Sequence, residues 1–154
     1  MMGATSTLKL IRLPNVLIGF FTVLLGGLLG GASTVDHWIV VGLHAISVGG
    51  FMSAWNVYND LMDIEGDQIN HPRRPLASGA VSIETARKIA MFSLVTSIIG
   101  LLSAAGWVST SGGDLSAWLP SLPIWFLALL LMIHYEFEGE HSLRLKHKGL
   151  PLSL

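Results

Sequence analysis

Four long stretches without Asp, Glu, Lys or Arg limit the folds open to this chain. They cover residues 13–35, 37–59, 89–113 and 115–133. A helix needs roughly 20 apolar residues to cross the hydrocarbon core of a bilayer, and each stretch is about that long or longer. A helix also satisfies its own backbone hydrogen bonds, as lipid surroundings require. The sequence therefore predicts an all-α, polytopic membrane helix bundle with about four transmembrane helices.

Composition supports this class and excludes others. The chain has 154 residues, of which 51% are hydrophobic and 12% are charged, so we expect residues 1–154 to form a single membrane domain. The formal net charge of −1 gives no sign of a nucleic-acid partner. The absence of cysteine excludes disulfides, thiolate metal sites and cysteine nucleophiles.

The basic residues predict how the helices are oriented. With four spans, all nine lie on one side of the membrane: Lys9, Arg12, Arg73, Arg74, Arg87, Lys88, Arg144, Lys146 and Lys148. Loops rich in Lys and Arg favour the cytoplasmic side. We therefore expect an integral protein of the plasma membrane with both termini and the loop around residue 72 in the cytoplasm.

Glycine and proline mark features within these helices. Two overlapping G-x-x-x-G patterns are formed by Gly26, Gly27, Gly30 and Gly31. They favour either close helix packing or flexibility near a helix end, and the sequence does not choose between the two. Pro14 suits the start of the first helix, where a missing N–H costs nothing. Pro120 and Pro123 predict a shifted or kinked entry into the last helix.

A cluster of carboxylates follows the second stretch. On a helix, Asn59, Asp63 and Asp67 are spaced i, i+4, i+8, and Asp60 falls on the same face. Acidic groups on one face repel each other unless a cation lies among them. Hard oxygen ligands are those that Mg²⁺ takes, often together with waters and substrate phosphates.

Two arginines, Arg73 and Arg74, come next in the chain. Carboxylates beside arginines are typical of a site for a metal ion and a diphosphate. The alternative is a solvated acidic loop between two membrane helices, and paired aspartates alone leave that alternative at least as probable.

The full string at this point resembles a known motif. Residues 59–67 read N-D-L-M-D-I-E-G-D, and residues 72–79 read P-R-R-P-L-A-S-G. Both are similar to the first aspartate-rich motif of the UbiA superfamily of intramembrane prenyltransferases, N-D-x-x-D-x-x-x-D followed by P-x-R-P-L-x-S-G. The resemblance implies Mg²⁺-dependent transfer of a polyprenyl group from its diphosphate to a lipid-like or aromatic acceptor, within the membrane lipids.

The resemblance also implies roles for individual residues. Asn59, Asp63 and Asp67 match the catalytic positions that hold Mg²⁺, with Asp60 in the same metal site and Asn56 supporting it.

Three basic residues match positions that contact the diphosphate or face its cavity: Arg74, Arg12 and Lys146. Arg73 is more typical of a solvated neighbour. Family members often carry a tyrosine shortly before that lysine, but residues 136–142 intervene here, so Tyr135 is given no role.

Residues 63–70 and the Lys-Gly-Leu-Pro ending look most like geranylgeranylglyceryl-phosphate geranylgeranyltransferases, which make ether-lipid precursors. Quinone-type, chlorophyll-type and haem-type members share the first motif.

A second aspartate motif, D-x-x-x-D, is found in complete members, whereas after Asp67 this sequence has only Asp114. We therefore expect the N-terminal half of a UbiA-type bundle, a fragment or one half of a split enzyme, that is inactive without the C-terminal half as partner.

Several features carry weaker hypotheses. His37 and His44 lie on one face of the second helix and favour a satisfied polar pair over a metal or haem site. Glu136, Glu138, Glu140 and His141 favour a solvated insertion over a second carboxylate site. The competing functional class is a non-enzymatic membrane protein, a transporter piece or an assembly factor with an acidic cytoplasmic loop. A transporter favours ionisable groups near the bilayer midplane, whereas here they gather at one surface.

Overall fold

The computed structural model describes residues 3–136 and is built there from helices joined by short turns, without a strand. This confirms the predicted all-α class. In chain order the helices are α1 (Ala4–Leu10), α2 (Leu13–Leu29), α3 (Val35–Met62), α4 (Ile64–Asn70), α5 (Ile83–Thr110), α6 (Leu115–Trp118) and α7 (Ser121–Glu136).

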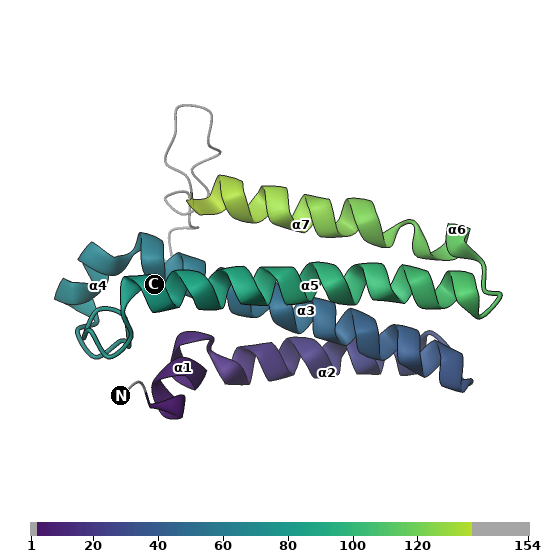
Figure 1. Ribbon diagram of the computed structural model, residues 1–154, viewed down its shortest axis with the longest axis horizontal. Coiled ribbons are helices and arrows are strands. Elements are labelled where there is room, and N and C mark those ends of the chain that lie inside the picture. Colours follow the sequence, from purple (N-terminus) through teal and green to yellow (C-terminus); the bar gives the residue numbers. More distant parts are fainter. Residues whose placement is uncertain (1–2, 137–154) are drawn as a thin grey trace, which may run out of the picture. The chain divides into compact units, whose positions relative to one another are not determined.

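The chain divides into two compact units, residues 1–115 and residues 116–154. In the first unit, α3 is the central helix and packs along both α2 and α5, as Figure 1 shows. The short helices α1 and α4 lie at the same end of this unit, next to the start of α5 (Figure 1). The second unit contains α7.

Among the described residues, three helical segments are long and apolar enough to cross a membrane: α3 and α5, each of 28 residues, and the 20 residues Leu115–His134. A fourth span is possible if α1 and α2, which meet at a bend of 60°, are taken together. The predicted number of about four spans is therefore compatible with the fold. The bend was not predicted, and it lies at Arg12, whose backbone is left-handed with φ 54° and ψ 55°.

Helices α3 and α5 cross without room for side chains. A Cβ at Gly50 would lie 2.7 Å from the carbonyl oxygen of Ser93, and one at Gly100 would lie 2.9 Å from the carbonyl oxygen of Leu43. Between them, the hydroxyls of Ser47 and Ser97 are 3.3 Å apart. Small residues thus let the two backbones touch, which is how helices commonly associate in lipid.

The sequence left two roles open for the glycines at the end of α2: close helix packing, or flexibility near a helix end. The structure shows packing at one of them and a helix end at another. A Cβ at Gly27 would lie 2.7 Å from the Val41 side chain of α3, so this glycine serves packing. Gly31 has φ +85° just beyond the helix end, so this one serves termination. The predicted interruption near Pro120 is also present, because α6 ends at Trp118 and α7 begins at Ser121.

Candidate active site

The predicted row of oxygen ligands lies where α3 meets α4. The α-helix is interrupted at Asp63, which has φ −91° and ψ 7°. Helical hydrogen bonds nevertheless cross the junction: the N–H of Asp63 donates to the carbonyl of Asn59 at 3.0 Å, and the N–H of Asp67 donates to that of Asp63 at 2.8 Å. Asn59, Asp63 and Asp67 therefore follow one another at one-turn intervals, as their spacing predicted.

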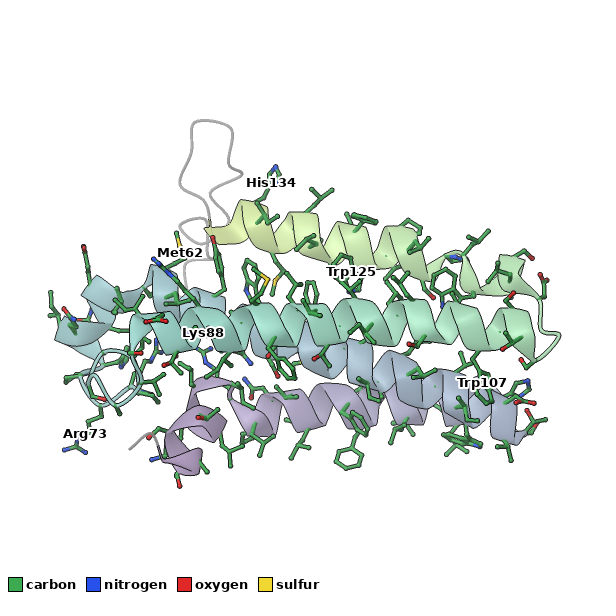
Figure 2. The ribbon with its side chains drawn as sticks, in the orientation of Figure 1. Met62, Arg73, Lys88, Trp107, Trp125 and His134 are labelled. Atoms are coloured by element: carbon green, nitrogen blue, oxygen red, sulfur yellow. The ribbon has the colours of Figure 1, made fainter. Side chains whose placement is uncertain are left out.

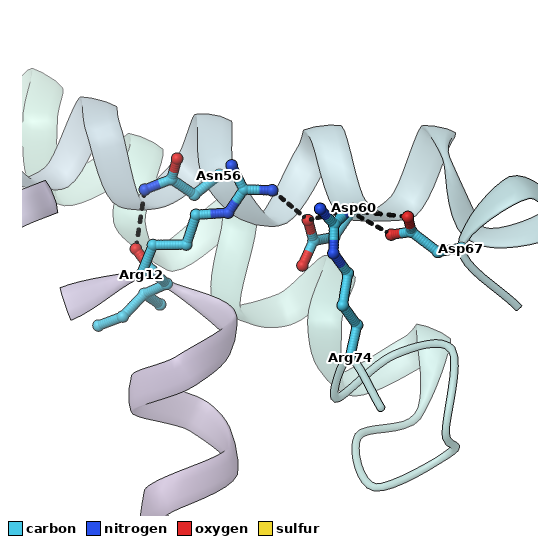
Figure 3. A network of polar contacts seen from close by, with 6 residues as sticks. Arg12, Asn56, Asp60, Asp67 and Arg74 are labelled. Carbon is cyan, nitrogen blue, oxygen red and sulfur yellow. Dashed lines mark hydrogen bonds and ion pairs between the residues drawn. The ribbon is translucent and has the colours of Figure 1, made fainter. Parts of the chain in front are cut away.

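Asp60 is buried and paired with an arginine. Only 3% of the residue is exposed, and its Oδ1 accepts a hydrogen bond from Nη2 of Arg12 at 2.7 Å (Figure 3). A buried carboxylate without a partner is strongly destabilising, so this ion pair accounts for how Asp60 is tolerated inside the bundle.

Arg12 reaches Asp60 from the bend between α1 and α2. The neighbouring carbonyl of Ile11 accepts a hydrogen bond from Nδ2 of Asn56 at 2.8 Å (Figure 3). A left-handed conformation costs a non-glycine residue roughly 1–2 kcal/mol, which these two contacts with α3 offset. Asn56 thus fixes the bend that carries Arg12, and its predicted support of the metal site stays a prediction.

Asp67 is paired with the second arginine. It is 6% exposed, and Nη1 of Arg74 lies 2.8 Å from its Oδ1 and 2.6 Å from its Oδ2. The same Nη1 is 3.8 Å from Oδ1 of Asp60, so Arg74 lies between the two buried carboxylates (Figure 3). Two aspartates and two arginines thus form one charge-balanced network.

The loop that carries Arg74 is anchored by the residues that follow the arginine. Leu76 and Val81 are 4% and 2% exposed and pack with Leu10 of α1 and Val57 of α3. After the loop, the Ser82 hydroxyl accepts from the N–H of Thr85 and caps α5. Apolar packing therefore holds the loop backbone in place while the arginine side chain, 34% exposed, remains accessible.

The remaining candidates lie around this network or outside the described residues. Asn59 and Asp63 are half-buried, whereas Glu65 and Arg73 are exposed. In Figure 2, Arg73 points away from the helices, as expected of a solvated neighbour. Lys146 and the insertion that contains Glu138, Glu140 and His141 lie outside the described residues, so their predicted roles stay predictions.

His37 lies in the first turn of α3, whose N-cap is Thr34. It is exposed, its Nδ1 accepts from the N–H of Ser33 at 3.3 Å, and its own N–H donates to the Thr34 hydroxyl at 3.2 Å. His44 is half-buried further along α3. His37 thus makes its hydrogen bonds at the start of its own helix, and the polar pair predicted for His37 and His44 stays a prediction.

The oxygen ligands of the aspartate motif have the chemistry that Mg²⁺ takes. Among the side chains that the structure describes, no group of three or more His, Asp or Glu is close enough to form a ready-made metal cage. Mg²⁺ seldom uses such a cage, since it is commonly bound by one or two carboxylates plus waters and substrate phosphates. Asp63 and Asp67, with the amide oxygen of Asn59, are of the right chemistry for that arrangement. They fit a metal ion that arrives with a diphosphate.

Sequence comparison agrees with the motif. The model of the UbiA prenyltransferase family matches residues 19–105, more than half of the chain and including the whole aspartate motif. The chain belongs to the UbiA prenyltransferase family. Together with its long apolar helices, this makes it an integral membrane protein. The resemblance inferred from the motif is thereby confirmed.

Several archaeal relatives are named digeranylgeranylglyceryl phosphate synthase. The chain is 30% identical to the one from Methanobrevibacter smithii over 82% of its own length and 41% of the relative's. The relative from Methanocaldococcus jannaschii is 38% identical over 62% of this chain and 32% of its own length. The relative from Ignicoccus hospitalis is 32% identical over 96% of this chain and 41% of its own length. The chain thus spans less than half the length of these relatives. No solved structure gives a significant match.

The structure shows two pairings that the sequence did not predict. Arg12 pairs with Asp60 and Arg74 pairs with Asp67, whereas the sequence assigns these aspartates to the metal and these arginines to the diphosphate. Asp60 and Asp67 are seven residues apart and therefore share a helix face. That spacing, together with the presence of Arg12 and Arg74, is the sequence signal from which the pairings could have been predicted.

Proposed function

We propose that this chain supplies the first aspartate motif of a Mg²⁺-dependent UbiA prenyltransferase that makes ether lipids. The reaction would transfer a geranylgeranyl group from its diphosphate to a glyceryl phosphate that already carries one such ether. The observation that carries this proposal is the buried network of Asp60, Asp67, Arg12 and Arg74 at one end of an apolar helix bundle. The names of the archaeal relatives support the choice of substrate class.

In this proposal the polar network receives the diphosphate and the apolar helices receive the hydrocarbon tail. The guanidinium of Arg74, and that of Arg12 behind it, can form charge-assisted hydrogen bonds to phosphate oxygens. Asn59, Asp63 and Asp67 would hold Mg²⁺, which when bound neutralises charge on the leaving diphosphate. The tail would lie along the apolar, lipid-facing surfaces of the helices, out of contact with water.

The chemistry then follows from charge. The bond between the first prenyl carbon and its oxygen breaks, and the electron pair leaves with the diphosphate. The hydroxyl oxygen of the acceptor forms the new bond to that carbon, and its proton passes to the departing diphosphate or to water. Fixed positive groups around the departing diphosphate favour this step because they lie where negative charge develops.

A cytoplasmic orientation is part of the proposal. Arg73 and Lys88, the latter near the start of α5, lie at one end of the first unit, whereas Trp107 lies at the other (Figure 2). We expect a cysteine placed at residue 72 to react only with reagents that reach the cytoplasm. Labelling of that cysteine from outside intact cells would overturn this orientation.

The test of function uses the chain in lipid nanodiscs and a chimaera. Geranylgeranyl diphosphate should bind the chain in Mg²⁺ and be released by EDTA. Fused to the region of the Methanocaldococcus jannaschii relative that follows the matched part, the chain should transfer labelled geranylgeranyl to geranylgeranylglyceryl phosphate. Failure of both binding and transfer by a correctly inserted protein would refute the proposed function and favour a non-enzymatic role.

A further inference from the structure

Arg74 occupies the place on Asp67 where a metal ion would bind. Its Nη1 lies 2.8 Å from Oδ1 and 2.6 Å from Oδ2, so one nitrogen lies between both carboxylate oxygens. A cation that chelates a carboxylate approaches from this same side. The guanidinium and a metal ion therefore cannot both use this position on Asp67.

Burial decides what Asp67 requires. With 6% of the residue exposed, its charge is poorly compensated by water, and some cation must neutralise it. Without a ligand that cation is Arg74. If Mg²⁺ takes its place, the guanidinium needs another anion, and a diphosphate is the anion that the proposed reaction brings.

The surroundings allow Arg74 to move without moving the loop. Leu76 and Val81 are anchored in the apolar cluster with Leu10, which fixes the backbone on the far side of the arginine. The Arg74 side chain itself is 34% exposed. Asp60 keeps Arg12 at 2.7 Å when Arg74 leaves, so only Asp67 needs a replacement cation.

We propose that Arg74 is an exchangeable counterion of the metal site: it neutralises Asp67 in the empty enzyme and passes to the diphosphate when metal and substrate bind. This inference rests on the proposed function. It implies that metal alone binds weakly, because metal must displace Arg74 without a diphosphate to accept it. It also implies that metal and diphosphate strengthen each other's binding reciprocally.

The experiment measures binding of Mn²⁺, as a paramagnetic stand-in for Mg²⁺, to the chain in nanodiscs without diphosphate. Arg74→Gln should tighten Mn²⁺ binding about tenfold, because displacing a charge-assisted hydrogen bond no longer opposes the metal. The matched control is Arg73→Gln, which removes the same charge from an exposed neighbour. It should change the affinity by less than about twofold, since exposed charges are screened.

With geranylgeranyl diphosphate present, the wild type should bind Mn²⁺ more tightly than Arg74→Gln, which is the opposite of the order without it. The diphosphate should tighten Mn²⁺ binding to the wild type more than to Arg74→Gln, and Arg74→Gln should bind the diphosphate about tenfold more weakly than Arg73→Gln. The double variant Arg74→Gln/Asp67→Asn should lose the gain in metal affinity, which locates that gain at Asp67.

Arg74→Lys provides a second variant that keeps the charge. A lysine lacks the planar guanidinium, so its Mn²⁺ affinity without diphosphate should lie between those of wild type and Arg74→Gln. Equal Mn²⁺ affinity of the wild type, Arg74→Gln and Arg74→Lys would overturn the exchange. If instead the wild type binds no geranylgeranyl diphosphate at any Mn²⁺ concentration, the proposed function fails first, so the two failures are distinguishable.

Discussion

Helix α3 is crowded in two places, at its crossing with α5 and at its junction with α4. At the crossing, Gly50 and Gly100 each lie so close to the other helix that a Cβ would approach its backbone to within 2.9 Å. At the junction, Asp60 and Asp67 are buried as well, but arginines from other segments form ion pairs with them.

The two places differ in what they can tolerate. The crossing is specified by shape, because backbone meets backbone and nothing there can move aside. The junction is specified by charge, and a charged partner can be exchanged for another cation while the helices stay packed. Changes that add volume at the crossing should therefore unfold the bundle, whereas changes at the junction should alter ligand binding and leave the bundle folded.

The largest effect is expected from Gly100→Leu. The new side chain must push α5 away from Leu43 and Ser47, which should lower the free energy of unfolding by about 3 kcal/mol or more. Thermal unfolding in detergent would measure this loss. The matched control is Gly106→Leu, on the same helix at an exposed glycine with nothing within 4 Å of a Cβ.

Equal unfolding temperatures for the Gly100 and Gly106 variants would contradict a crossing held by shape. It would mean that α3 and α5 can separate without loss of stability.

The next effect is expected from Asp67→Asn, which should abolish metal-dependent transfer by the chimaera while the protein remains inserted and folded. The asparagine cannot neutralise a metal ion, but Arg74 keeps a carboxylate nearby because Asp60 is 3.8 Å away. The cost in stability should therefore be only about 1 kcal/mol. Asp63→Ala should have the same effect on transfer, and Glu65→Gln, an exposed carboxylate of α4, should have little.

Undiminished transfer by Asp67→Asn or Asp63→Ala, with activity that survives EDTA, would show that the acidic residues form only a solvated loop.

The sequence predicted the parts of this structure that depend on local patterns. Charge-free length predicted the spans, and Pro120 predicted the break before α7. The motif spacing predicted the one-turn intervals between Asn59, Asp63 and Asp67, because that order is set by the helix itself.

Features that join distant segments were not predictable in the same way. The left-handed Arg12 and its bond to Asp60 depend on how α1 and α2 meet α3. Similarly, Ser93 and Ser97 were not singled out in the sequence, because small residues in an apolar helix fit a lipid-facing surface as well as a crossing. Only the packing of α5 on α3 decides between them.

A moderate effect is expected from Arg12→Gln, which tests whether the ion pair between Arg12 and Asp60 stabilises the junction. Asp60 would lose its 2.7 Å partner and keep Arg74 at 3.8 Å, so the loss of stability should be about 1–2 kcal/mol. The bend between α1 and α2 should also loosen, and diphosphate binding should weaken. The control is Lys9→Gln, which removes an exposed basic residue from the preceding turn.

If Arg12→Gln and Lys9→Gln melt alike and bind diphosphate alike, the bond between Arg12 and Asp60 does not hold the site together.

The smallest effect is expected from Ser47→Ala, although this residue lies at the centre of the crossing. The substitution removes a hydrogen bond of 3.3 Å to Ser97 but keeps a small side chain, so the backbones can stay in contact. Such bonds between membrane helices contribute about 0.6 kcal/mol on average, and the loss should be of that size. Thermal unfolding beside Ser103→Ala, an exposed serine of α5, would measure it. A loss as large as that of Gly100→Leu would mean that the polar bond, and not the close approach of the backbones, holds α3 to α5.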